Sequence, residues 1–373
     1  MKKYNRICFI SNSAWYLNNF RESTLHRFKK EYSVACLIPH EDVTSFNSLD
    51  GTSLGRYYLD PTSKNVVKEF LTLCSIFLRL VFSRPDIVFS FNPKTNLYSL
   101  IACWILRIPC VPNVSGVGQA SQLDGLTGKI YNKLVAFFYK RATHVYFQNS
   151  QDHQSFIAKE FVTHSYSEVL PGSGVDLKKF TPVNINGVRS FLMAARLIYP
   201  KGVMQFINAS KNILDSKMLG RFYLAGVKEY TARSIPEINI VSFNEYHNAE
   251  YLGQVTNMPE VLNRIHCMVL PSYYPEGTPR SLLEAAAAGK VIITTDTPGC
   301  RDVVIEGVNG FLVPPRDTEA LEEAIEKVIN LSDEKLAEMQ ANSRKLAEEK
   351  FDEQYVIQRY LDVAEEILAK KSK

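Results

Sequence analysis

The segment CMVLPSYYPEGTPRSLLEAAAAGKVIITT, residues 267–295, contains two apolar runs separated by a Gly/Pro-containing loop and a helical pattern. Residues 267–271 and 291–295 are short and apolar, as buried strands are, whereas residues 279–288 are rich in Leu and Ala. Two such strands joined through a helix predict a βαβ unit in a parallel sheet. The loop after the first strand is therefore expected at the carboxyl edge of the sheet, where α/β proteins usually bind ligands.

The same alternation of strands and helices extends over the whole chain. Residues 1–182 are expected to contain strands at 6–11, 33–38, 86–91, 110–114, 144–148 and 168–170, with helices near 18–30, 64–82, 94–106, 128–141 and 150–160. After a turn-rich link at 181–189, strands are expected at 190–195, 221–225, 239–241, 267–271, 291–295 and 310–313, with helices near 201–215, 258–265, 279–288, 300–306 and 317–330. This pattern predicts two Rossmann-like parallel-sheet domains that face each other across a ligand cleft.

We place these α/β domains at residues 1–182 and 190–350. Residues 332–371 are rich in Glu, Lys and Ala at helical spacing, with a break near 351–352. We therefore expect residues 351–373 to form a C-terminal helix that packs back on the N-terminal domain.

The composition is that of a globular protein, with 373 residues of which 46% are hydrophobic and 22% charged. The seven cysteines are scattered and form no CxxC pair, which indicates a reducing compartment and argues against a disulfide framework or a zinc site. The apolar run at 7–10 is shorter than the core of a signal peptide, and no stretch has the about 20 apolar residues of a spanning helix. These features predict a cytoplasmic protein.

Charge is unevenly distributed between the two halves. Residues 1–182 carry 21 Lys and Arg against 13 Asp and Glu, whereas residues 183–373 carry 22 against 26. A basic half favours an anionic partner such as a diphosphate lipid or a membrane surface, although solvated faces explain the excess equally well. Segments 64–82 and 127–141 are basic and aromatic, as a membrane-docking face would be. Helices that cover a parallel sheet look similar; that interpretation is favoured for the first segment and stays open for the second.

Two cations stand where a strand gives way to a helix. Arg196 ends the strand at 190–195, and Lys201 with Gly202 opens the next helical pattern. The amino end of a helix carries about half a positive charge, so the three features together form a suitable clamp for an anion such as a diphosphate. In the alternative interpretation, Lys201 lies on the surface and Arg196 forms a structural ion pair.

Two carboxylates flank the helix that follows residues 267–271. Thr278 is expected to cap this helix and Pro279 to be its first residue, which places Glu276 before the helix and Glu284 inside it. Their axial separation is roughly 7–8 Å, about the span from a hexose over a diphosphate to a ribose. Carboxylates accept hydrogen bonds from vicinal hydroxyls, and Gly277 and Thr278 offer backbone N–H groups between them. The alternative is an ordinary capped helix with a surface glutamate.

Together these motifs resemble the retaining glycosyltransferase family 4, whose members have the GT-B fold. Glu276 and Glu284 match the family's E-x7-E pattern, and residues 195–202 are similar to its R-L and K-G element. The resemblance is specific over about 168–330, where segments 170–176, 294–300 and 306–312 also match, and looser before it. In segment 170–176 the family's usual asparagine is replaced.

The resemblance implies a role for each matched residue in a donor site. Arg196 and Lys201 would neutralise the leaving diphosphate, Glu276 would contact the donor sugar, and Glu284 would hold the ribose. Residues 252–257 would line the nucleobase, and the remaining donor-site positions are Gly253, Val255, Asn257, Gly277, Thr278 and Pro279. The implied co-substrate is a nucleotide sugar, UDP-linked, with no other cofactor and no metal, in keeping with the lack of a D-x-D motif.

Loops of the N-terminal half resemble a subgroup that builds bacterial capsule, O-antigen or lipid-linked glycans. In that subgroup the matching loops face the acceptor, here at Asn19, Arg21, Asn92, Lys94, Gly116 and Gly118. The resemblance implies transfer of a hexose or N-acetylhexosamine to a polyprenyl-diphosphate-linked or growing glycan, not a nucleic acid. The enzyme would work peripherally at the inner face of the cytoplasmic membrane. Residues 41–143 contain no histidine, so the histidine that many relatives place in this domain has no clear counterpart.

Two other functions stay open on the sequence alone. One is a UDP-sugar epimerase of the same fold, and the other is a non-catalytic module that binds nucleotide sugars or glycans. Dinucleotide binding is disfavoured, because the glycines at 116 and 118 lack both a third glycine and a later acidic residue. The seven histidines are dispersed without the spacing of metal ligands.

Overall fold

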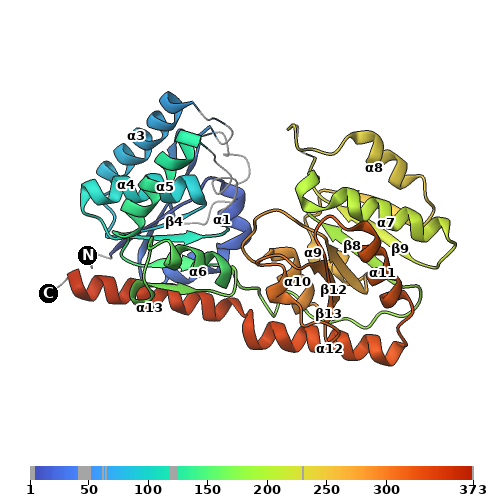
Figure 1. Ribbon diagram of the computed structural model, residues 1–373. Helices are drawn as coiled ribbons and strands as arrows, with labels where there is room; N and C mark the ends of the chain where they lie inside the picture. Colours follow the sequence, from blue (N-terminus) through green and yellow to red (C-terminus); the bar gives the residue numbers. More distant parts are fainter. Residues whose placement is uncertain are drawn as a thin grey trace. The chain divides into compact units, whose positions relative to one another are not determined.

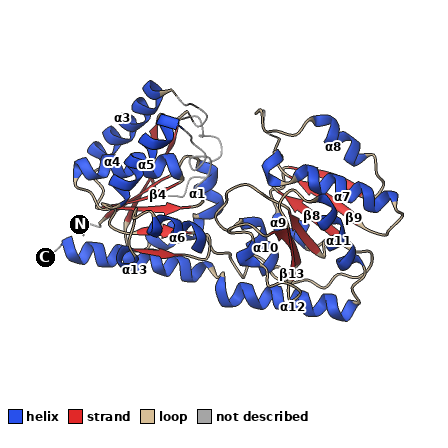
Figure 2. Ribbon diagram, viewed as in Figure 1, coloured by secondary structure: helices blue, strands red, loops and turns tan. Residues whose placement is uncertain are grey.

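The computed structural model describes residues 5–40, 52–60, 63, 65–116, 125–228 and 231–371. The chain forms two compact units, one from Met1–Ser173 with Gln354–Lys373 and the other from Gly174–Glu353. Each unit has a parallel sheet with helices packed on it (Figures 1 and 2). The prediction of two Rossmann-like parallel-sheet domains with a helical C-terminus is confirmed.

The sheet of the N-terminal unit has the strand order β3-β2-β1-β4-β5-β6-β7. All its neighbouring strands are parallel, as expected for strands connected through helices. The strands are β1 (Arg6–Ile10), β2 (Ser33–Pro39), β3 (Ser53–Tyr57), β4 (Ile87–Phe91), β5 (Cys110–Val114), β6 (Val145–Phe147) and β7 (Ser167–Val169). The helices are α1 (Ala14–Phe20), α2 (Glu22–Lys29), α3 (Val66–Ser83), α4 (Pro93–Leu106), α5 (Gly125–Tyr139), α6 (Ser150–Ala158), the short 3₁₀ turn His164–Tyr166 and α13 (Glu353–Lys371).

Helices cover both faces of this sheet. Successive residues of a strand point to opposite faces, and in β1 Phe9 contributes to one core while Cys8 contributes to the other. The core around Phe9 includes α1, α2 and the C-terminal helix α13, and the core around Cys8 includes α3, α4 and α5 (Figure 1). The end of the chain is thus an integral layer of the N-terminal unit.

The sheet of the C-terminal unit has the strand order β10-β9-β8-β11-β12-β13, again all parallel. Its strands are β8 (Ser190–Ala194), β9 (Arg221–Ala225), β10 (Ala249–Gly253), β11 (Cys267–Leu270), β12 (Val291–Thr295) and β13 (Gly310–Val313). Its helices are α7 (Val203–Asp215), α8 (Glu237–Asn244), α9 (Met258–Leu262), α10 (Arg280–Ala287), α11 (Thr318–Ile329) and α12 (Asp333–Lys350), with 3₁₀ turns at Tyr199–Lys201 and Arg301–Val303.

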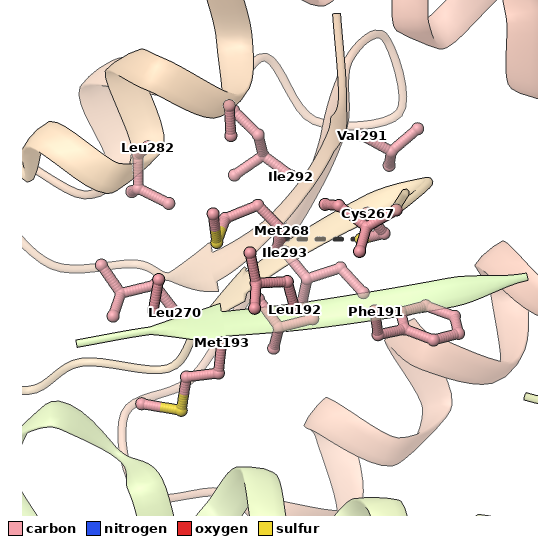
Figure 3. Close-up of a cluster of buried hydrophobic side chains, with 14 of the residues drawn as sticks. Phe191, Leu192, Met193, Cys267, Met268, Leu270, Leu282, Val291, Ile292 and Ile293 are labelled. Carbon is pink, nitrogen blue, oxygen red and sulfur yellow. Dashed lines mark hydrogen bonds between the residues drawn. The ribbon is translucent and has the colours of Figure 1, made fainter. Parts of the chain in front are cut away.

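The core of the C-terminal unit holds its central strands firmly. Side chains of β8, β11 and β12, among them Met193, Met268 and Ile293, belong to one buried cluster that also includes Leu282 of α10 (Figure 3). These residues are fully buried. Because protein cores are close-packed and resist deformation, the loops that leave the carboxyl ends of β8 and β11 start from a rigid base.

Several elements differ from the sequence-based prediction. Strands β3 and β10 were not expected; both lie at a sheet edge, where a strand needs fewer apolar residues than a central one. Residues 239–241, predicted as a strand, lie inside α8, and the helix expected at 300–306 is only the short turn Arg301–Val303. A short apolar run does not by itself distinguish a strand from a turn of helix.

The boundary between the units lies at 173/174 and not in the turn-rich stretch 181–189. The reason is that Val175 and Phe180 are buried in the core of the C-terminal unit. Val175 also exchanges backbone hydrogen bonds with the end of α12, since its N–H donates to the Phe351 carbonyl and its own carbonyl accepts from the Glu353 N–H.

Candidate functional site

The loops that follow β8 and β11 form the candidate site, and the sheet makes them neighbours because β8 pairs directly with β11. Gly202 brings their backbones into contact. It has a φ of 79°, and a Cβ atom at this position would lie 2.1 Å from the carbonyl oxygen of Pro271. The Tyr273 N–H also donates to the Pro200 carbonyl over 2.9 Å. Only glycine fits this approach, so the loop that carries Lys201 is held against the loop that carries Glu276.

An ion pair joins the two loops. Lys201 Nζ donates to Glu276 Oε2 over 2.5 Å, and both side chains are only 12% exposed. The second carboxylate oxygen, Oε1, accepts from the Ser272 hydroxyl over 2.6 Å. Glu276 is therefore fixed from both sides, in a partly desolvated place where charge interactions are stronger than in water.

An aromatic ring lies beside both cations of the site. The Arg196 guanidinium carbon is 5.7 Å and the Lys201 ammonium 5.6 Å from the centre of the Tyr274 ring, within the range of cation–π attraction. The Tyr274 backbone N–H donates to the same Ser272 hydroxyl that bonds Glu276, over 3.3 Å. Arg196 and Lys201, which the sequence placed together as an anion clamp, thus share one neighbour.

Glu284 lies on α10 and forms an ion pair within that helix. Arg280 Nε donates to its Oε1 over 2.8 Å, which is the usual i,i+4 geometry. Burial raises the pKa of Glu284 in spite of the opposing charges of Arg280 and Lys179. Carboxylates whose pKa is raised by burial are common in ligand sites.

The start of α10 differs from the expectation. Pro279 occupies the N-cap position without a side-chain cap, so Thr278 does not cap the helix; it is a buried residue one position earlier. The backbone is extended at Pro279, where the 276–279 loop enters the helix. There Gly299 packs on it: a Cβ at Gly299, whose φ is 80°, would lie 1.8 Å from the Gly277 carbonyl oxygen.

The third predicted group of donor-site residues lies at the end of the edge strand β10. Gly253 has a φ of 67° next to an irregularity in the β9–β10 pairing. A groove of about 320 Å³ lies beside it and is lined by Val255 and Asn257 together with residues of β9, β10 and α9. Neither Lys201 nor Glu276 is among the residues that line this groove.

The N-terminal loop residues named by the sequence occupy different environments. Asn92, at the end of β4, has a φ of 75°, and its Oδ1 accepts from the Ser11 hydroxyl over 3.2 Å, which ties the loops after β1 and β4 together. Lys94 is ion-paired with Glu69 of α3 over 2.7 Å. Asn19 is exposed on α1, Gly116 lies two residues after the end of β5 with a φ of 97°, and Gly118 lies outside the described residues.

Arg21 is placed in the core and not on an exposed loop. Its side chain is fully buried, and its guanidinium carbon lies 4.9 Å from the centre of the Phe91 ring and 5.3 Å from that of Tyr360. Nη2 donates to the Tyr16 hydroxyl over 3.4 Å, whereas no partner within the described ranges accepts from Nε or Nη1. Stacking on aromatic faces explains how a guanidinium is tolerated there.

Sequence reasoning missed the two residues that organise the site, Ser272 and Tyr274. A serine in a loop carries no signal of its own, because its partner Glu276 is found only once the loop is folded. The pairing of Arg280 with Glu284 was readable from their i,i+4 spacing. Among the described residues, no group of three or more His, Cys, Asp and Glu side chains could hold a metal ion.

Two fixed cations beside a partly buried carboxylate can bind an anion and neutralise charge that develops on it. Comparison with known proteins shows which enzymes the chain is similar to. Residues 177–346 match the family model described as "Glycosyl transferases group 1". The chain is 25% identical to the N,N'-diacetylbacillosaminyl-diphospho-undecaprenol alpha-1,3-N-acetylgalactosaminyltransferase of Campylobacter jejuni, with 97% of this chain and 99% of that relative covered. It is also 25% identical to the UDP-Gal:alpha-D-GlcNAc-diphosphoundecaprenol alpha-1,3-galactosyltransferase of Escherichia coli, with 76% of each covered.

The chain is a glycosyltransferase. Its fold is similar to that of HepE from Anabaena, solved in complex with UDP and glucose, with a TM-score of 0.79 and 15% identity over 97% of this chain and 100% of that one. This likeness shows that the glycosyltransferase has the GT-B fold. The predictions of enzyme class and fold are confirmed, whereas the roles of single residues stay predictions.

Proposed function

We propose that this glycosyltransferase transfers a hexose or N-acetylhexosamine from a UDP-sugar to a polyprenyl-diphosphate-linked or growing glycan, with retention of anomeric configuration as in family 4. The observation that carries the proposal is the Lys201–Glu276 ion pair with Arg196 beside it, at the carboxyl edge of a parallel sheet. Two relatives are named for acceptors on diphospho-undecaprenol, one of them with a UDP-linked donor, and a protein of similar fold holds UDP.

In the proposed mechanism the protein acts on the leaving group. As the glycosidic bond breaks, negative charge grows on the UDP diphosphate, and Arg196 and Lys201 offset it. Lys201 is already oriented and partly desolvated by its ion pair with Glu276, so little reorganisation of Lys201 is needed as the charge develops. Arg196 is exposed and lies beside the same Tyr274 ring. Glu276 holds Lys201 and has hydroxyl-binding capacity of its own, which suits contact with the donor sugar.

Glu284 is proposed to hold the ribose, and the backbone around Gly277 and Thr278 to bind between the two carboxylates. The N-terminal loops at Asn92, Lys94 and Gly116 are proposed to meet the acceptor. No metal or other cofactor enters this proposal. The enzyme is proposed to work as a peripheral protein at the inner face of the cytoplasmic membrane, where lipid-linked acceptors are available.

A transfer assay tests the proposal. The purified chain is incubated with UDP-hexoses and UDP-N-acetylhexosamines, each with and without a synthetic polyprenyl-diphosphate-linked N-acetylhexosamine. We expect one donor to give UDP release and a lipid product heavier by one sugar, with the anomer read by NMR. Interconversion of UDP-sugars without acceptor would instead show an epimerase. Donor binding with no turnover under any condition would show a binding module.

A further inference from the structure

The outer surface of helix α3 is apolar, although that surface faces away from the sheet. The inner stripe of α3 consists of Thr72, Ile76 and Leu80, which are buried against the sheet. A second stripe, Val67, Phe70, Leu71, Leu78 and Phe82, repeats at helical spacing and is exposed, with Phe70 63% and Phe82 81% accessible. A helix that only covers a sheet needs one apolar stripe. The sequence alone favours a role for segment 64–82 in covering the sheet. That role does not explain why the outer stripe of α3 is apolar.

The neighbouring helices extend this apolar surface. Helix α4 packs against both α3 and α5 (Figure 1). At the end of α4, Trp104 and Ile105 are exposed, and the Trp104 ring contacts the half-exposed Phe137 of α5 edge-on at a centroid distance of 5.8 Å. The guanidinium of Arg141 lies 3.6 Å from the centre of the Phe137 ring. Tryptophan and arginine around apolar side chains are typical of groups that sit at a membrane–water interface.

The charge of the three helices is almost entirely positive. Segments 65–84, 93–107 and 125–141 contain nine Lys and Arg but one acidic residue, Glu69, which is paired with Lys94. Arg79, Arg84 and Lys133 are exposed among the apolar residues. The C-terminal unit also exposes apolar residues such as Leu219 and Ile238, but residues 183–373 carry 26 acidic against 22 basic side chains. Only the helical layer α3–α5 combines exposed aromatic residues with such a cationic excess among the described residues.

We propose that the α3–α5 surface, with Phe70 and Phe82 as its main apolar residues, docks the enzyme on an anionic phospholipid bilayer. The apolar side chains enter the headgroup boundary, and the lysines and arginines bind lipid phosphates. Charge complementarity selects this partner over a neutral one. No helix in the described part of the chain is long and apolar enough to cross a membrane, so the contact is superficial.

The first turn of α3 places the docking surface near the loops that are proposed to bind the acceptor. Lys94, which follows β4, donates from Nζ to Glu69 and to the Ser63 carbonyl, so the first turn of α3 adjoins the carboxyl end of the sheet. The apolar stripe begins in that turn, at Val67 and Phe70. A lipid whose tail stays in the bilayer would present its diphosphate close to the Asn92 loop. This part of the inference rests on the proposed function.

Vesicle flotation of the full chain tests the docking surface. We expect the chain to float with vesicles that contain about 30% phosphatidylglycerol in phosphatidylcholine and far less with phosphatidylcholine alone, and binding to weaken as salt rises to about 0.5 M. The double variant F70S/F82S should reduce partitioning at least about tenfold, because two aromatic side chains no longer leave water. R79Q/K133Q should remove most of the preference for anionic vesicles.

The matched control is L219S/I238S, which removes two similarly exposed apolar residues from the C-terminal unit and should float like the wild type. Equal flotation of F70S/F82S and this control, or no flotation of the wild type, would overturn the proposal. So would a dimer in sedimentation equilibrium that F70S/F82S dissociates, since the surface would then join two copies of the chain.

Transfer assays separate this inference from the proposed function. F70S/F82S should transfer sugar to a short-chain, water-soluble acceptor at the wild-type rate and lose transfer to a long-chain acceptor embedded in vesicles. If no acceptor of any chain length is glycosylated while flotation behaves as expected, the proposed acceptor is wrong and the docking surface stands. If F70S/F82S glycosylates both acceptors at wild-type rates, the surface does not serve acceptor delivery.

Discussion

At the scale of single residues, the side chains of the site are fixed by hydrogen bonds and an ion pair with one another. Ser272 and Lys201 each bond one oxygen of Glu276, and the Tyr274 ring lies near both Arg196 and Lys201. The sequence predicts Arg196, Lys201 and Glu276 because strand ends of a parallel sheet meet at one edge. It does not predict Ser272, because the hydrogen-bond partner of a loop serine depends on how the loop is folded.

Replacement of Ser272 tests this arrangement. S272A removes one hydrogen bond to the Glu276 carboxylate, so Glu276 and its partner Lys201 are held less firmly and kcat/KM should fall at least about tenfold. Because such a bond contributes about 1.5–3 kcal/mol to stability, Tm should also fall by several degrees. The control is S242A, since Ser242 also bonds a charged side chain, that of Lys211 over 2.6 Å, but lies on α8. Steady-state kinetics on both variants check the prediction; equal kcat/KM for S272A and wild type would show that Glu276 needs no second anchor.

At the scale of elements, backbone contacts set the shape of the loops, and glycines make these contacts. The sequence pattern correctly located the central strands β8, β11 and β12, whose residues are buried throughout and mostly apolar. It missed β3 and β10, because edge strands are half solvated and lack that signature. It also could not show that α3 is apolar on two opposite sides, since a helix buried on one side and membrane-facing on the other has the same composition as a fully buried one.

Gly299 offers a sharp test of loop positioning. A methyl group at Gly299 would meet the Gly277 carbonyl at 1.8 Å, so G299A must displace the 276–279 loop. We expect kcat/KM to fall at least about 100-fold, as misplacement by about 1 Å commonly does. G307A is the matched control, because Gly307 has a similar φ of 71° but no heavy atom within 4 Å of the added Cβ. Near-normal activity of G299A would show that this loop tolerates displacement.

At the scale of the whole molecule, the chain ends in the unit where it began. Helix α13 supplies Tyr360 to the core of the N-terminal unit, where its hydroxyl accepts from Asn113 Nδ2 over 2.6 Å and its ring lies against Arg21. Asn113 in turn bonds Gln148 and Asn96, so the helix is joined to the sheet by a buried polar network. The amphipathic tail was visible in the sequence, but these polar partners were not.

Loss of Tyr360 should therefore destabilise the protein strongly. Y360A leaves a large cavity and an unsatisfied Asn113 amide, and we expect a loss of about 3–5 kcal/mol in the free energy of unfolding. Y355A, on the same helix but 52% exposed, should change it by less than about 0.5 kcal/mol. Urea denaturation followed by circular dichroism measures both. Equal stability of the two variants would mean that α13 is not part of this core.

His266 gives the stability of the C-terminal unit a pH dependence. Burial lowers the pKa of His266, whose Nδ1 accepts from the Ser190 N–H over 3.1 Å and so must be unprotonated, while its Nε2 lies 3.2 Å from the Ile185 carbonyl. Above about pH 6.5 the imidazole of His266 is neutral in both the folded and the unfolded state. The hydrogen bonds of the neutral ring then contribute fully to the free energy of unfolding. As the pH falls below that value, the unfolded state takes up a proton that the folded state excludes, so stability is lost down to the folded pKa.

The variant H266Q tests this window. Glutamine can both accept from Ser190 and donate to Ile185 without titrating, so the fall in Tm between pH 7.5 and 5.5 should be smaller in H266Q than in the wild type. Calorimetry at the two pH values measures it. A fall of the same size in both proteins would assign the acid sensitivity to other groups.

Binding of UDP to wild type, K201M and K211M, measured by isothermal titration calorimetry, tests the central claim most directly. Lys201 is proposed to bind the diphosphate, whereas Lys211 bonds Ser242 away from the site. We predict that K201M raises the Kd for UDP at least about tenfold, the loss expected for one charged hydrogen bond, and that K211M leaves it unchanged. If UDP binds K201M as tightly as it binds the wild type, the Lys201–Glu276 loops are not the donor site.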